Sequence, residues 1–306
     1  MNEKLFSSPL TFLSLPLSQD FTGADVAILG IPFDCGRDPT RLGSRLGPNS
    51  IRHASVLTAN LMNDAKPSPL DSIRVIDAGN VKLSLEDIEQ AFDQIGKAMR
   101  EIIEGDCVPV TVGGDGAVSL PQMRALNKQH GEFAVLHFDA HTDAWPVEDG
   151  GAYTNANQFT FAVKEKLVDM DSAIHIGTRG PVNALAAIEY AESLGYEVIP
   201  FDQVRQQGEQ SLLRHLNHRI GNKPVYICYD MDFFDPSVAP GVATPTPGGA
   251  MPVEGIGLLR GLKGLNIIGI DINTTSPLHD PSGVTATLAA SMLAESLGIL
   301  ADKHGY

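Results

Sequence analysis

Residues 133–143 read FAVLHFDAHTD, a short apolar run that ends abruptly in carboxyl and imidazole side chains. The run is continuous rather than alternating, which is typical of a strand buried on both faces of a sheet. Residues 224–235 read PVYICYDMDFFD and repeat the plan, with Asp230, Asp232 and Asp235 after the apolar run. Together the two stretches predict a parallel sheet that carries polar side chains at the carboxyl ends of its strands.

Six further apolar runs extend this pattern in both directions along the chain. They are residues 24–30, 73–79, 107–114, 172–180, 196–200 and 265–272. Helical stretches lie between the runs, such as residues 85–105 and 284–305. Because strands and helices alternate over the whole length, we predict one α/β domain, residues 1–306, with helices on both sides of a parallel sheet.

Composition excludes several classes of partner. The 306 residues are 43% hydrophobic and 19% charged, and the formal net charge is −15. A chain of this length buries a sizeable core without disulfides. Its negative charge disfavours nucleic acid and anionic membrane surfaces as partners. We expect neither a membrane-spanning segment nor a secretory signal.

The three cysteines, Cys35, Cys107 and Cys228, form no CxxC pair. Their odd number and apolar neighbours are typical of a reducing compartment, so we predict a cytoplasmic protein with three buried thiols.

The two polar segments predict a divalent metal site. Asp139, His141 and Asp143 alternate, so in an extended chain their side chains would point the same way. Carboxylates crowded at a sheet edge repel one another unless a cation lies among them. One imidazole with several carboxylates suits Mn²⁺, with Ni²⁺, Co²⁺ and Fe²⁺ as alternatives. Either segment alone would equally fit a hydrogen-bonded core histidine or a turn aspartate; both together favour the metal.

Residues 113–116, Gly-Gly-Asp-Gly, lie between a predicted strand and a predicted helix. Such a turn can cradle a phosphate, but it lacks the lysine of a P-loop and the spacing of a dinucleotide fingerprint. A nucleotide- or sugar-binding module is therefore the least favoured class of function.

The order of these motifs resembles that of the ureohydrolases, the family of arginases and agmatinases. The resemblance rests on residues 113–115, 139–143 and 230–236, and the flanking residues 30–52, 239–249 and 259–272 also resemble agmatinases. It runs from about residue 24 to about residue 300. It implies an arginase/deacetylase-like fold, a three-layer α/β/α sandwich around a central eight-stranded parallel sheet. It also implies hydrolysis of a guanidino compound at a two-metal centre, usually manganese.

The resemblance assigns roles to five residues. Asp139 and Asp230 resemble the ligands that bridge the two metals. His141 and Asp232 resemble the remaining ligands of one metal, and Asp143 resembles a ligand of the other. The catalytic set implied is Asp139, His141, Asp230 and Asp232.

Three positions depart from the family pattern. Gly116 stands where the family has a histidine ligand of the Asp143-side metal. Thr274 stands where a glutamate grips the guanidinium, and Asn155 stands where a histidine shuttles protons. Thr274 and Asn155 are therefore the candidate substrate-binding residues.

Two functions remain open on this evidence. The first is a metal-dependent hydrolase of a guanidino or amidine C–N bond, with urea or a related product and an atypical substrate preference. The second is a catalytically weakened paralogue that serves as a structural or regulatory subunit of a heteromeric ureohydrolase. The resemblance implies a trimer or hexamer of identical chains, or a hetero-oligomer with such a paralogue.

Overall fold

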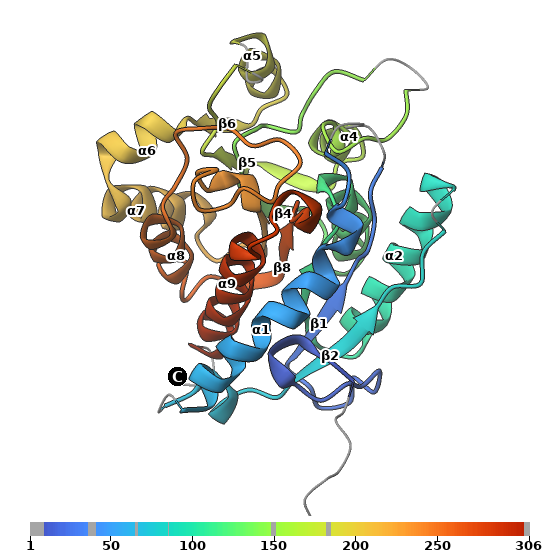
Figure 1. Cartoon of the computed structure of the whole chain (residues 1–306). Helices are drawn as coiled ribbons and strands as arrows, with labels where there is room; N and C mark the ends of the chain where they lie inside the picture. Colours follow the sequence, from blue (N-terminus) through green and yellow to red (C-terminus); the bar gives the residue numbers. More distant parts are fainter. Residues whose placement is uncertain are drawn as a thin grey trace, which may run out of the picture.

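A parallel sheet forms the middle layer of the protein in the computed structural model (Figure 1), which describes residues 9–35, 41–64, 67–84, 86–147, 151–181 and 185–302. Its strands are β1 (Val26–Gly30), β2 (Val75–Asn80), β3 (Val108–Val112), β4 (Phe133–Phe138), β5 (Val168–Ile176), β6 (Glu197–Ile199), β7 (Val225–Asp230) and β8 (Ile267–Asn273). Their order across the sheet is β2-β1-β3-β8-β7-β4-β5-β6, and all neighbours are parallel. Each predicted apolar run forms one strand, which confirms the eight-stranded α/β fold.

Helices cover both faces of this sheet (Figure 1). They are α1 (Gly47–Asp64), α2 (Ile88–Glu104), α3 (Ser119–His130), α4 (Gln158–Lys164), α5 (Leu185–Ser193), α6 (Phe201–Gln207), α7 (Glu209–Ile220), α8 (Pro252–Arg260) and α9 (Val284–Ala301). One hydrophobic core joins the sheet to α1, α6, α7, α8 and α9, and the other joins it to α2, α3, α4 and α5. All residues of β1, β4, β7 and β8 are buried, as continuous apolar strands require.

The sequence of α2 explains why that segment is a surface helix. Its N-cap, Asp87, accepts a hydrogen bond from the backbone N–H of Gln90, and the helix ends at Gly105. Its buried residues recur with helical spacing and pack on the sheet: Ala91, Phe92, Ile95, Gly96, Met99, Ile102 and Ile103.

Helix α9 differs, because it is apolar over most of its surface. By length and composition alone it is long and apolar enough to cross a membrane, a test that the core helix of a globular protein also passes. In the fold, 67% of this 18-residue window is buried inside the protein, as in the core helix of a globular domain.

The four central strands of the sheet, β3, β8, β7 and β4, bring polar residues to one edge. Asp115 and Gly116 follow β3, and Thr274 follows β8. Asp230 is the last residue of β7, and Asp139 comes directly after β4. Since the strands are parallel neighbours, these residues lie at the same carboxyl edge, where open α/β sheets bind ligands.

A buried ion pair ties α1 to β2 and to the N-terminal segment. The Arg52 guanidinium donates to both oxygens of Asp77, at 3.0 and 3.1 Å, and lies over the ring of Phe12. The Asp77 side chain is fully buried, and its Oδ2 also accepts from the Phe12 backbone N–H at 2.8 Å. Arg52 therefore neutralises a carboxylate that water cannot reach.

Replacement of Arg52 by methionine is expected to lower the free energy of unfolding by about 3–5 kcal/mol, because it leaves the Asp77 carboxylate buried and unpaired. The matched control is Arg260→Met, which breaks the ion pair to Glu295 at an arginine side chain that is 63% exposed. That loss should be at most about 1 kcal/mol. Urea unfolding of the two variants measures both values, and equal losses would contradict a special role for Arg52.

Candidate metal centre

The segment after β4 bends as soon as the strand ends at Phe138. Asp139, His141 and Asp143 are all buried there. Asp143 has φ 49°, a left-handed conformation that non-glycine residues adopt at an energetic cost and that clusters at functional sites. Our expectation of an extended, alternating segment is therefore wrong, although the predicted meeting of side chains occurs.

The segment after β7 brings the second pair of carboxylates. Asp230 closes the strand, and Asp232 lies in a 3₁₀ turn, η5 (Met231–Phe233). Arg179 fixes this turn, because its Nη2 donates to the Asp232 carbonyl oxygen at 2.6 Å. The Asp232 side chain accepts a weaker hydrogen bond from the Ala140 backbone N–H, at 3.4 Å, which links the two segments.

Potential ligand atoms in and beside these segments form three overlapping groups. Within each group the atoms all lie within 4.8 Å of one another, and every residue is buried. The first group is Asp139, His141 and Asp232; the second is His137, Asp139, Asp143 and Asp230; the third is His137, Cys228 and Asp230. The structure therefore brings together the five residues proposed as ligands and adds His137 to them.

The carboxylates in these groups are held in an unfavourable state when no cation is near. Burial raises the pKa of Asp139, Asp143 and Asp230 well above the usual range. Repulsion adds to this effect, from Asp232 on Asp139 and from Asp139 on the other two. A divalent cation among them would remove both penalties.

Both ring nitrogens of His141 lie close to polar side chains, as expected for a metal ligand held in place by a second contact. Its Nδ1 lies 3.2 Å from Asp139 Oδ1 and 3.5 Å from Asp232 Oδ2. Its Nε2 lies 3.3 Å from the Thr246 hydroxyl, the kind of outer contact that orients metal-bound imidazoles. Burial opposes the charged imidazole, but Asp232 and Asp139 overcome this and raise the His141 pKa. Burial likewise opposes charge on Asp232, whose pKa His141 nevertheless lowers.

His137 lies beneath the carboxylates and was missed by the sequence analysis. Its Nε2 lies 3.1 Å from Asp139 Oδ2 and 3.6 Å from Asp230 Oδ1, and its Nδ1 lies 2.8 Å from His175 Nδ1. The available signal was its place two residues before Asp139 on a strand, which puts both on one face. Cys228 also lies near, but burial raises its thiol pKa well above the usual range, so it stays a neutral neighbour.

The departures from the family pattern all line one small cavity of about 70 Å³. Asn155 lies on its wall, and its Oδ1 accepts a hydrogen bond from the Cys35 thiol at 3.5 Å. Thr274 has φ 66°, a strained conformation for a β-branched residue, and its hydroxyl accepts from the Met231 backbone N–H at 2.9 Å. The cavity is lined by Asp115, Gly116, Asp139, His141, Asp143, Trp145, Asn155, Ala156, Asp230, Asp232, Ala243, Thr244 and Thr274.

Other carboxylates that follow or end strands have different roles. Asp271 lies inside β8, fully buried, and accepts hydrogen bonds from Thr111 and Ser119 at 2.6 and 2.9 Å. It belongs to no ligand group among the described residues. Asp235 holds the following loop: burial is outweighed by hydrogen bonds from Ser237 and two glycines, which lower its pKa to about 2.

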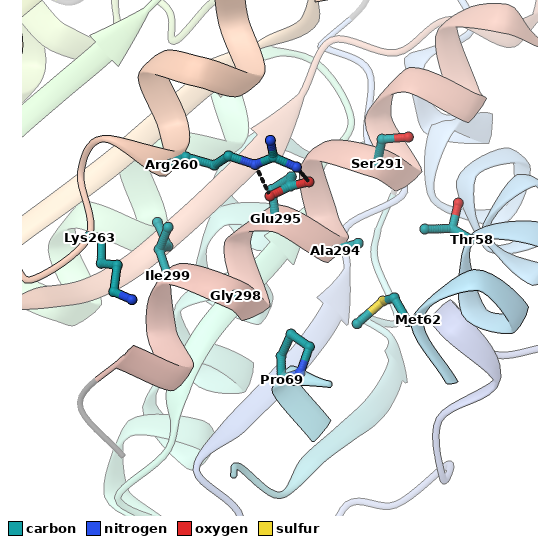
Figure 2. A pocket seen from close by; sticks show the side chains of 10 residues that line it. All are labelled: Thr58, Met62, Pro69, Arg260, Lys263, Ser291, Ala294, Glu295, Gly298 and Ile299. Atoms are coloured by element: carbon teal, nitrogen blue, oxygen red, sulfur yellow. Dashed lines mark hydrogen bonds and ion pairs between the residues drawn. The ribbon is translucent and has the colours of Figure 1, made fainter. Parts of the chain in front are cut away.

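A larger hollow lies between α1, α8 and α9 (Figure 2). Its lining residues differ in chemistry from the ligand groups. Its volume is about 570 Å³. Its charged side chains pair with one another or with a neighbour: Arg260 with Glu295 at 2.6 Å, and Lys263 with Asp302 at 2.9 Å. None of the candidate ligand groups found among the described residues lies here, so the sheet edge remains the candidate site.

The residues at the sheet edge fit a divalent metal. The donor set is rich in carboxylates with one well-placed imidazole, and burial makes unpaired negative charge costly there. The cavity beside the ligand groups is large enough only for a small polar head group. Such an arrangement suits metal-assisted addition of water to a small substrate.

Comparison with known proteins matches this chain to one family over most of its length. The arginase family model matches residues 24–298, a range that contains every candidate ligand. The mitochondrial agmatinase of Gallus gallus is 34% identical over 290 residues, 95% of this chain and 85% of that protein. The guanidinobutyrase of Pseudomonas aeruginosa is 32% identical over 298 residues, 96% of this chain and 93% of that protein. The solved structure of proclavaminate amidino hydrolase from Streptomyces clavuligerus is similar with a TM-score of 0.90 and 33% identity, covering 98% of this chain and 99% of that chain.

Proposed function

This chain belongs to the arginase family, and we propose that it is a metal-dependent hydrolase that cleaves a guanidino or amidine C–N bond and releases urea or a related product. The observation that carries this conclusion is the pair of ligand groups that share Asp139 at the carboxyl edge of the sheet. The relatives, named as an agmatinase, a guanidinobutyrase and an amidinohydrolase, favour this function over a non-catalytic subunit.

We propose that divalent cations are held by Asp139, His141, Asp143, Asp230 and Asp232. Manganese is the preferred ion, with nickel as the alternative, because the set has many carboxylates and one imidazole. Asp139 and Asp230 would contribute to both ions, and His141 with Asp232 would complete one of them. When bound, such cations lower the pKa of water and polarise the substrate, which supplies the nucleophile that hydrolysis needs.

The protein's own residues would position the substrate in the small cavity. Its volume of about 70 Å³ admits a guanidino or amidine group, and the rest of the substrate would extend past lining residues such as Trp145 and Thr244. Thr274 offers its hydroxyl, one lone pair of which already accepts from Met231. Asn155 offers a neutral amide beside the ligand groups. Neither side chain is able to form a charged pair with a guanidinium.

The isolated chain is therefore expected to be a poor arginase and a poor agmatinase. A hydrogen bond to a charged group contributes roughly 1.5–3 kcal/mol, so its absence costs about one to two decades in rate if it is made mainly in the transition state. Lack of a general acid at Asn155 removes about 10²-fold more. Turnover should be higher for a guanidino or amidine compound whose head group needs no carboxylate partner.

The test is a urea-release assay with the metal-loaded chain on arginine, agmatine, guanidinobutyrate and a series of substituted guanidines and amidines. We expect one member of the series to exceed agmatine and arginine clearly. The assay is repeated with any paralogue of the same family, to detect a partner that supplies the missing groups. Fast turnover of arginine or agmatine by the chain alone would contradict the roles given to Thr274 and Asn155.

Location, domain organisation and assembly are further parts of the proposal. We propose a cytoplasmic protein of one domain, supported by the free thiols of the buried residues Cys107 and Cys228. We propose an oligomer, either a trimer or hexamer of this chain or a hetero-oligomer with a paralogue. Light scattering on the purified chain, alone and mixed with the paralogue, distinguishes these assemblies.

A further inference from the structure

The space beside Gly116 is already filled, although this residue has no side chain. A Cβ built on Gly116 would lie 2.8 Å from Gln158 Nε2 and 3.0 Å from Asp143 Oδ2. Gly116 is not among the residues with positive φ, so its backbone would accept any side chain. The neighbouring amide of Gln158, rather than the backbone, therefore occupies the position from which a longer side chain would reach the ligand groups.

Gln158 is the first residue of α4 and is almost completely buried. Its Nε2 donates to Asp143 Oδ2 at 2.6 Å, while its Oε1 is buried without a hydrogen-bond partner. A buried amide oxygen with no partner is unfavourable in a folded protein unless a donor or a cation satisfies it. Amide oxygens are also ordinary ligands of hard divalent cations.

We propose that Gln158 replaces the imidazole missing at Gly116 and binds the Asp143-side cation through its amide oxygen, with the terminal amide turned so that Oε1 takes the place where Nε2 now lies 2.6 Å from Asp143 Oδ2. This inference rests on the metal centre of the proposed function and assigns it a ligand. The ligand set on that side then consists of oxygen atoms from Asp139, Asp143, Asp230 and Gln158. Such a set favours Mn²⁺ or Mg²⁺, whereas the His141 side keeps the imidazole that Ni²⁺ also accepts.

His137 is the other candidate for this place, and its hydrogen bonds argue against it. To bind a cation through Nε2, His137 would have to donate its Nδ1–H to His175 Nδ1. The proton of neutral His175 would then sit on Nε2, which is buried without a partner. In the opposite tautomers His175 donates to His137, and His137 Nε2–H lies 3.1 Å from the Asp139 carboxylate, an attractive contact that is not aligned as a hydrogen bond. The buried N–H then keeps a carboxylate neighbour, which costs less than the N–H of His175 with no hydrogen-bond partner.

The experiment is a titration of the metal-stripped protein with Mn²⁺, followed by electron paramagnetic resonance and elemental analysis. Wild type should bind one tight ion and one weaker ion. Gln158→Met should weaken the second ion by about tenfold or more and keep the first. Gln158→Glu distinguishes a ligand from a hydrogen-bond donor. If Gln158 is a ligand, the glutamate oxygen should bind the second ion more tightly. If Gln158 only donates a hydrogen bond to Asp143, its loss should weaken binding of the second ion.

Two further variants sharpen the result. Gly116→His alone should fail to strengthen the second site, because Gln158 fills the space. Gly116→His with Gln158→Ala removes that obstruction, so it should restore the second ion and add a nitrogen coupling to its spectrum. The matched control is Gln122→Met, at a buried glutamine that accepts a hydrogen bond from Thr111 and belongs to no ligand group described here. This control should keep both ions.

The outcomes separate this inference from the proposed function. The role of Gln158 would be overturned if Gln158→Met bound the second ion as tightly as wild type does. It would also be overturned if Gln158→Glu bound the second ion more weakly. In both cases the first ion would remain bound. Wild type that binds no ion at all would overturn the metal centre itself, and the inference with it.

Discussion

Replacement of Asp230 by asparagine is expected to lower kcat/KM by about 10³-fold or more and to release bound metal. Asp230 ends β7 and contributes a buried oxygen to the group that contains Asp139 and Asp143. An asparagine amide keeps the shape of the side chain but lacks the charge that holds a divalent cation. Metal catalysis supplies several kcal/mol of transition-state stabilisation, and a loss of about 4 kcal/mol corresponds to about 10³ in rate.

Steady-state kinetics and elemental analysis of the same preparation test this expectation. The control is Asp235→Asn, because Asp235 belongs to the same sequence motif but holds a loop through Ser237 and Gly248. The control should retain its metal. An Asp230→Asn variant with wild-type metal content and activity would remove Asp230 from the proposed ligand set.

Metal affinity is expected to fall steeply as the pH falls. Without a cation, burial and mutual repulsion raise the pKa of Asp139, Asp143 and Asp230, and carboxylate neighbours raise that of His141. These groups must lose their protons to bind a metal, so binding releases protons. Below the raised pKa values, each proton released costs about tenfold in apparent affinity per pH unit, so two protons cost about 10⁴ over two units.

Calorimetric titration in buffers of different ionisation enthalpy counts the protons released. The free energy of unfolding of the metal-free protein should change in the opposite direction to metal affinity. Its buried carboxyls bind more protons folded than unfolded, so its stability should fall as the pH rises above about 3.8, the ordinary aspartate value. The difference in melting temperature between metal-loaded and metal-free protein should therefore widen towards neutral pH. Affinity that does not depend on pH would contradict the protonated, cation-free cluster.

Sequence reasoning was sufficient for the sheet because its strands are buried on both faces. A run such as residues 133–138 is apolar throughout, and this pattern depends little on what lies elsewhere in the chain. The positions of Asp139 and Asp230 were equally predictable, since residues after parallel strands meet at one edge. The bend at Asp143, with its positive φ, could not be predicted from the sequence, because local strain depends on the surrounding fold.

Contacts between distant segments account for what the sequence analysis missed. Gln158 fills the space beside Gly116 although 42 residues separate them, and only the packing of α4 against the turn after β3 brings them together. His137 and His175 meet because β4 and β5 are neighbours in register. Asp271 also lies near a strand end, but its neighbours Thr111 and Ser119 satisfy it inside the sheet.

Metal dependence of hydrolysis by the isolated chain tests the central claim most directly. One preparation is assayed for urea or the corresponding product with its best guanidino or amidine substrate, then stripped with a chelator, assayed again, and reloaded with Mn²⁺. The account predicts product formation that disappears on stripping and returns on reloading, in proportion to the metal bound. Turnover that survives complete removal of metal, or a fully loaded protein that hydrolyses no guanidino or amidine compound, would contradict it.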